Sequence, residues 1–226
     1  MAPFIDLHTH SKGFISSEVL AIKSIDLCTQ GADDIGEQPV SVGLHPWHIE
    51  QATLQKLLYL LEHYAQQENI LMLGEIGLDR NSRVDMELQK SAFEMQCQIA
   101  YQHHLPCILH IVKAWEELFA TLKRLGREQP LFIIHGFRGK PDLAKSLIDK
   151  GFYLSFGSHY SQESLLVAWQ AHHLFLETDE AELSIATHYQ QVAEMLGITS
   201  KTLRETIFEQ GAELLPLLPY LLSSMR

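Results

Sequence analysis

The residues best suited to chemistry in this sequence are histidines and carboxylates that follow short apolar runs. The side chains at or just beyond the ends of these runs are His8, His10, His45, Glu75, His110, His135 and Asp179. Imidazole and carboxylate groups are the ligands that divalent transition metals take in proteins. If the apolar runs are strands whose ends meet, these residues predict a metal centre.

The first of these runs, Phe4–His10, has the sequence FIDLHTH. Side chains alternate between the two faces of a strand, so Asp6, His8 and His10 share one face and the apolar Ile5 shares the other with Leu7. A single histidine at the end of a strand is more often a hydrogen-bonded core or surface residue than a ligand. Several such positions in one register are hard to explain by packing, because buried ionisable groups cost free energy unless they are paired or ligated.

The elements that must position these residues are apolar runs alternating with amphipathic segments. The expected strands are residues 4–8, 19–27, 40–45, 70–77, 106–111, 131–136, 152–157 and 173–179. From the third run onward a helical segment follows each strand, with clear limits at 53–67, 85–104, 114–126, 141–151, 188–197 and 201–215. This alternation predicts a parallel sheet closed into a (β/α)8 TIM-type barrel, whose strands end at one mouth.

The early part of the barrel is irregular. Segments 9–18 and 28–39 are short or lack helical periodicity, so we expect one or two of the first helices to be missing. The sequence also leaves open that the second strand runs antiparallel to the first. With no repeat and no linker in the sequence, we expect a single barrel domain over residues 1–226.

The composition limits the class of partner and the compartment. The formal net charge is −11, so the fold carries no general attraction for nucleic acid or anionic membranes. A polyanionic substrate would need a local positive centre, which a bound metal can supply.

Charged residues interrupt the amino-terminal segment and no apolar stretch approaches membrane length, which argues against a signal peptide or membrane span. The cysteines lack metal-type spacing and favour a reducing cytoplasm: Cys28, Cys97 and Cys107.

Longer motifs carry a resemblance to a known family. DLHTH, SVGLHPW, GEIGLDR, LPCILHI, IHGFRG, LSFG and LETD occur in this order over residues 4–179. With these motifs the chain resembles the TatD-related metal-dependent deoxyribonucleases, a branch of the amidohydrolase superfamily. The resemblance implies a barrel hydrolase that cleaves phosphodiester bonds in DNA.

The resemblance also implies a site with two divalent ions. One ion would be held by His8, His10 and Asp179, the other by His110 and His135, with Glu75 bridging them. A water shared by the ions would be the nucleophile, Asp179 would take its proton, and His45 would contact the substrate. Two ions about 4 Å apart can clamp the attacking and leaving oxygens of a phosphodiester. Mixed imidazole and carboxylate ligands suit Zn, Mn, Fe or Ni, and Mg stays open.

The chain departs from the family pattern at the residues expected to meet phosphate. HIVKA stands where HSRDA is usual, which puts Val112 in place of an arginine. Lys113 or Arg138 could supply the missing charge, and the sequence does not choose between them. We therefore predict His45, Lys113 and Arg138 as substrate-binding residues.

Three functions stay open at this stage. The first is phosphodiester hydrolysis by a TatD-like, exonuclease-type DNase that takes a small phosphodiester or a DNA strand end, with Trp47 as a stacking face for a base. The second is hydrolysis of a small lactone, amide or phosphoester by the same ligands, since a fold does not choose a substrate. The third is metal binding without catalysis. The sequence gives no oligomeric state.

Overall fold

The computed structural model describes residues 2–11, 16, 18–30 and 35–215. The chain forms two compact units, one made of residues 1–23 with 133–226 and the other of residues 24–132. The two boundaries between the units, at residues 23/24 and 132/133, fall within strands. The single domain expected from the sequence stays a prediction.

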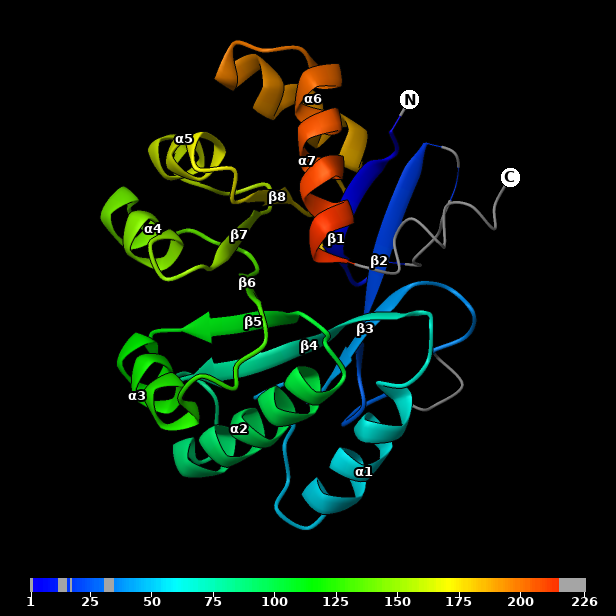
Figure 1. Ribbon diagram of the computed structural model, residues 1–226, viewed down its shortest axis with the longest axis vertical. Coiled ribbons are helices and arrows are strands. Elements are labelled where there is room, and N and C mark those ends of the chain that lie inside the picture. Colours follow the sequence, from blue (N-terminus) through cyan, green and yellow to red (C-terminus); the bar gives the residue numbers. More distant parts are fainter. Residues whose placement is uncertain (1, 12–15, 17, 31–34, 216–226) are drawn as a thin grey trace. The chain divides into compact units, whose positions relative to one another are not determined.

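The unit of residues 24–132 contains three strands and the helices that follow them (Figure 1). The strands are β3 (Val40–Gly43), β4 (Ile70–Asp79) and β5 (Cys107–Val112). The helices are α1 (Leu54–Tyr64), α2 (Met86–Gln102) and α3 (Trp115–Leu125). β4 pairs in parallel with both β3 and β5, and all of its residues are buried. Because β4 lies between β3 and β5 and is buried, its polar side chains need polar partners.

The other unit contains the two ends of the described chain. Its strands are β1 (Phe4–Thr9), β2 (Val19–Asp26), β6 (Phe132–Ile134), β7 (Tyr153–Phe156) and β8 (Leu174–Leu176), of which β2 and β6 cross the boundary. Its helices are α4 (Pro141–Ile148), α5 (Gln162–Gln170), α6 (Ile185–Leu196) and α7 (Ser200–Leu214). β6 pairs with β7 and β7 with β8, in parallel. A parallel bridge from Thr9 to Asp179 joins β1 to the residues after β8.

The sequence left an antiparallel second strand open, and this alternative is wrong. β2 pairs with β1 in parallel, with Phe4 opposite Val19 and Asp6 opposite Ala21. The connection of residues 10–18 is long enough, since an extended chain of this length spans about 30 Å and β1 only about 20 Å. No described residue between β1 and β2, or between β2 and β3, is helical, as the sequence predicted.

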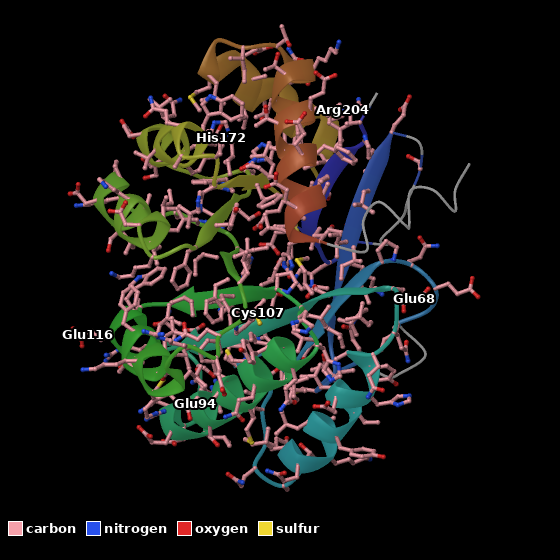
Figure 2. All side chains as sticks on the ribbon, in the orientation of Figure 1. Glu68, Glu94, Cys107, Glu116, His172 and Arg204 are labelled. Carbon is pink, nitrogen blue, oxygen red and sulfur yellow. The ribbon has the colours of Figure 1, made fainter. Side chains whose placement is uncertain are left out.

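Helix α6 fixes β1 through one tyrosine. Tyr189 is fully buried, and its hydroxyl donates to the carbonyl oxygen of Ile5 at 3.0 Å and accepts from the backbone N–H of Ile5 at 3.3 Å. Its ring meets Phe4 edge-on, with 5.1 Å between centroids. The guanidinium of Arg204 in α7, labelled in Figure 2, lies 4.3 Å from the centroid of the same Phe4 ring. These contacts hold the strand that carries His8.

We expect Tyr189→Phe to lower the free energy of unfolding by about 1–3 kcal/mol, because two buried backbone groups of Ile5 lose their partner. For a chain of this size each kcal/mol lowers the melting temperature by about 2–4 °C. The matched control is Tyr59→Phe in α1, where the side chain is 76% exposed and a change within about 0.5 kcal/mol is expected. Equal melting temperatures for the two variants would contradict the structural role of the Tyr189 hydroxyl.

No helix among the described residues is both long and apolar enough to cross a membrane.

Candidate metal centre

Four of the predicted ligands gather in the unit that holds both chain ends. The Asp179 carboxylate oxygen Oδ1 lies 3.5 Å from Nε2 of His10 and 3.7 Å from Nε2 of His8. The His8 ring lies 4.6 Å from that of His135 and 5.0 Å from that of His10, between centroids. His8, His135 and Asp179 each offer a ligand atom within 4.8 Å of the others. This donor set, two imidazoles and a carboxylate, fits a divalent transition metal.

Backbone bonds between β1 and the residues after β8 bring these side chains together. The N–H of Asp179 donates to the carbonyl of His8 at 3.0 Å, and the N–H of His10 donates to the carbonyl of Asp179 at 3.1 Å. Asp6 reinforces the junction by accepting from the N–H and the hydroxyl of Thr178 at 2.8 and 2.7 Å. Burial raises the pKa of Asp6 to about 6. Asp6 is therefore a structural residue, whereas the two histidines of FIDLHTH face Asp179.

Glu177 is a site residue that the sequence reasoning missed. Its side chain is fully buried, Oε1 accepts from the N–H of Gly136 at 2.7 Å, and the same oxygen lies 3.4 Å from Nδ1 of His135. Burial acts to raise the pKa of Glu177, but hydrogen bonding and charge from His135 outweigh it and lower the pKa. With Nδ1 facing this carboxylate, Nε2 is the nitrogen through which His135 can ligate. The motif LETD indicated this residue, because Glu177 stands two positions before Asp179 and side chains two apart in an extended segment share a face.

The unit of residues 24–132 contains a second cluster, formed by His45 after β3, Glu75 in β4 and His110 in β5. Glu75 does not end its strand as the sequence suggested, because β4 continues to Asp79. Oε2 of Glu75 lies 3.4 Å from Nδ1 of His110 and 3.5 Å from Nε2 of His45. The centroids of the two imidazole rings are 4.6 Å apart, and the ligand atoms of all three side chains lie within 4.8 Å of one another. Glu75 and His45 are buried. Distance alone would allow all three to be ligands.

The hydrogen bonds of His45 argue against ligation by this residue. The backbone N–H of Trp47 donates to Nδ1 of His45 at 3.2 Å, so Nδ1 must accept. The neutral ring then carries its proton on Nε2, which faces Glu75 and has no lone pair for a metal. Burial lowers the pKa of His45, despite the raising effect of Glu75, and so favours the neutral ring. His45 is thus a hydrogen-bond donor that faces Glu75, and its contact with substrate remains a prediction.

Asp79 is the second residue that sequence reasoning missed, at the end of GEIGLD. Its Oδ2 accepts from the indole N–H of Trp47 at 2.5 Å and lies 3.2 Å from Nε2 of His110, while Oδ1 accepts from the N–H of Asn81 at 2.7 Å. Burial acts to raise the pKa of Asp79, but these hydrogen bonds lower it below its usual range. A carboxylate at Nε2 directs Nδ1 of His110 toward Glu75 and fixes the nitrogen that can ligate.

Close contact between β4 and β5 places Glu75 beside His110. Gly77 lies opposite His110 in the parallel ladder. A Cβ atom on Gly77 would lie 2.0 Å from the carbonyl oxygen of His110, and the residue has a φ of +152°. Only glycine allows this approach. The second glycine of GEIG is therefore required by the geometry around the cluster.

The two predicted basic contacts differ in their surroundings. Arg138 is exposed and lines a cavity of about 250 Å³ together with Asp179, Glu180 and His159. Lys113 is exposed immediately after β5, with a φ of +52°. Arg138 therefore shares a cavity with a predicted catalytic residue of its own unit, and its role as a substrate contact remains a prediction, as does that of Lys113.

Parallel strands separated by helices, with imidazole and carboxylate clusters in or just beyond their carboxyl-terminal halves, define a metal-binding α/β barrel protein. A solved structure from Escherichia coli K12, the TatD homologue YJJV, matches with a TM-score of 0.75 at 20% identity, over 94% of this chain and 98% of that chain. The fold is the predicted (β/α)8 TIM-type barrel.

The chain belongs to the TatD-related DNase family, whose model matches residues 7–214. Among its relatives is the uncharacterized metal-dependent hydrolase YabD of Bacillus subtilis, 33% identical over 118 residues, which are 52% of this chain and 46% of the relative. The 3′-5′ ssDNA/RNA exonuclease TatD of Pantoea ananatis is 26% identical over 147 residues, covering 62% and 56% of the two chains. The chain thus matches about half the length of these curated relatives.

Proposed function

We propose that this chain is a metal-dependent nuclease that hydrolyses phosphodiester bonds at the ends of single-stranded nucleic acid. The observation that carries the proposal is the Asp179 carboxylate, 3.5 and 3.7 Å from two histidine nitrogens at the carboxyl ends of parallel strands. Family membership and the name of the Pantoea relative, a 3′-5′ ssDNA/RNA exonuclease, support the reaction class.

The proposed ligands are His8, His10 and Asp179 for one ion, His110 and His135 for the other, and Glu75 for both. That Glu75 serves both ions, and that His135 shares an ion with His110, rests on the family resemblance alone. When bound, the metals neutralise phosphate charge and acidify water. The side chain of Asp179 accepts the proton of the attacking water. His45 contacts the substrate, as the family resemblance implies, while its Nε2–H faces Glu75. Glu177 and Asp79 hold the rings of His135 and His110 in their ligating orientations.

The charge of the chain favours a small substrate segment over a long duplex. The net charge is −11, and Arg138 shares its cavity with Glu180 as well as with Asp179. Proteins that neutralise many phosphates present clustered lysines and arginines and lose affinity steeply with salt. We therefore propose a strand end or short oligonucleotide as substrate, and only a mild dependence of binding on salt.

A substrate panel tests the function directly. Single-stranded DNA, a small phosphodiester, lactones and acyl amides are each incubated with the protein and Mn²⁺, Mg²⁺ or Zn²⁺. We expect metal-dependent release of nucleotides from the DNA. Turnover of a lactone or amide, with none of any phosphodiester, would replace the nuclease proposal with the small-substrate alternative. No turnover of any compound by metal-loaded protein would favour metal binding without catalysis.

Removal of metal should abolish turnover. We expect protein purified without chelator to contain one or two divalent ions per chain, and dialysis against a chelator to reduce the rate by at least roughly 10²-fold, because the phosphate loses its charge partner. Elemental analysis and add-back of single metals measure occupancy and identity. His135→Ala should lower the metal content, whereas His159→Ala, which removes an exposed cavity residue, should not. Full activity of demonstrably metal-free protein would contradict the proposal.

A further inference from the structure

Trp47 is a large aromatic side chain that lies partly in solvent yet is firmly anchored. Its surface is 52% exposed. Its indole N–H donates at 2.5 Å to Oδ2 of Asp79, a carboxylate that is only 1% exposed. An isolated apolar residue on a surface needs no explanation. An exposed indole held by a buried carboxylate that also contacts a predicted metal ligand does need one.

The backbone around Trp47 is fixed as well. Its N–H donates to Nδ1 of His45 at 3.2 Å, and the N–H of His48 donates to the carbonyl of His45 at 3.0 Å. The hydroxyl of Ser82 donates to the carbonyl of Pro46 at 3.1 Å. The indole is therefore held in place before any ligand binds, which reduces the entropy lost on binding.

The faces of the indole are not taken up by parallel stacking within the described part of the chain. Its ring neighbours there are His45, His110 and His48, with centroid distances of 4.9, 5.4 and 6.4 Å. The interplanar angles are 79°, 82° and 82°, so all three contacts are edge-to-face. A flat ligand ring that stacked on Trp47 would lie next to the imidazoles of the site.

We infer that Trp47 forms a subsite for an unpaired nucleobase adjacent to the phosphodiester that is cleaved. The inference rests on the proposed function and extends it by naming what binds beside the reacting group. Stacking on an aromatic ring accepts every base, because each has a π face. The subsite therefore adds affinity without sequence preference, and it compensates for the scarcity of basic residues.

An unpaired base is required because a base inside a duplex is stacked on both sides and cannot also stack on the indole. The Trp47 subsite thus selects single strands and frayed ends over intact duplex. Asp79 links it to catalysis, since the same oxygen that holds the indole also orients His110. The base and the cleaved bond are in this way positioned by one carboxylate.

The kinetic test compares two substrates, a single-stranded oligonucleotide and the same strand with abasic residues at its cleaved end. We expect Trp47→Ala to raise KM for the base-bearing strand by about 5- to 100-fold. It should leave KM for the abasic strand within about twofold, and Trp47→Phe should retain part of the preference. The control is Tyr101→Ala, which removes a 41% exposed aromatic of α2. Equal effects of Trp47→Ala on both strands would overturn the inference, while turnover of the abasic strand would still support the nuclease.

A binding measurement separates the inference from the reaction. Tryptophan fluorescence is titrated with deoxyadenosine monophosphate and, as the baseless comparison, with deoxyribose 5-phosphate. We expect saturable quenching by the nucleotide only, and its loss in Trp47→Phe, where Trp115 and Trp169 remain. Equal responses to both compounds would overturn the base subsite. Quenching by the nucleotide from a protein that cleaves no DNA would keep the subsite and reject the nuclease.

Discussion

Asp179→Asn should lower turnover by roughly 10²- to 10⁴-fold, the range lost when a positioned proton acceptor is removed. The amide has the shape of the carboxylate but accepts no proton at neutral pH. Oδ1 of Asp179 lies 3.5 Å from His10 and 3.7 Å from His8, so the same change also weakens the metal cluster. The measurement is kcat on single-stranded DNA at saturating metal, with bound metal determined on the same sample.

The fold should survive this substitution. Asp179 has a φ of +53°, and asparagine is among the few residues besides glycine that adopt this conformation readily. Its backbone bonds to His8 and His10 involve no side-chain atom. Glu182→Gln is the matched control, because it neutralises an exposed carboxylate three residues away and should keep kcat within about threefold. A folded, metal-loaded Asp179→Asn protein with wild-type kcat would show that the proton acceptor is another group.

The strands and most helices were predictable because their hydrophobic periods are clear. The run 70–77 lies within β4 and the periodic segment 85–104 brackets α2. Helix α5 follows β7 as the alternation required, but its limits were not predictable, since QESLLVAWQ has buried Ser164 among its apolar positions. The direction of β2 was not predictable either, because parallel pairing depends on the reach of a loop rather than on a local pattern.

The predicted ligands within each unit were found together, but the residues that orient them were not foreseen. Asp79 and Glu177 lie in the same motifs as Glu75 and Asp179, and periodicity assigns a strand carboxylate to a face without naming its partner. The ligating nitrogen of a histidine depends on what the other nitrogen meets. For His45 that partner is a backbone N–H two residues away, a contact that only the folded loop creates.

Gly77→Ala should cause the largest loss of stability, roughly 4 kcal/mol or more, which is exceptional for a single substitution. The new Cβ would lie 2.0 Å from the carbonyl oxygen of His110, and the backbone atoms of β5 can move away only by breaking the ladder that β4 forms with β5. A φ of +152° adds strain for any side chain. Soluble yield and urea unfolding measure the effect.

The control separates the clash from the strain. Gly151 also has a positive φ, +86°, but a Cβ there would meet nothing within 4 Å. Gly151→Ala should therefore cost only about 1–2 kcal/mol, the conformational part alone. If Gly77→Ala instead unfolds at the same urea concentration as Gly151→Ala, β4 and β5 are not in the close contact that brings Glu75 to 3.4 Å from His110. The position of Glu75 in the site thus depends on a glycine two residues further along β4, which is why a loss of stability tests the geometry of the metal centre.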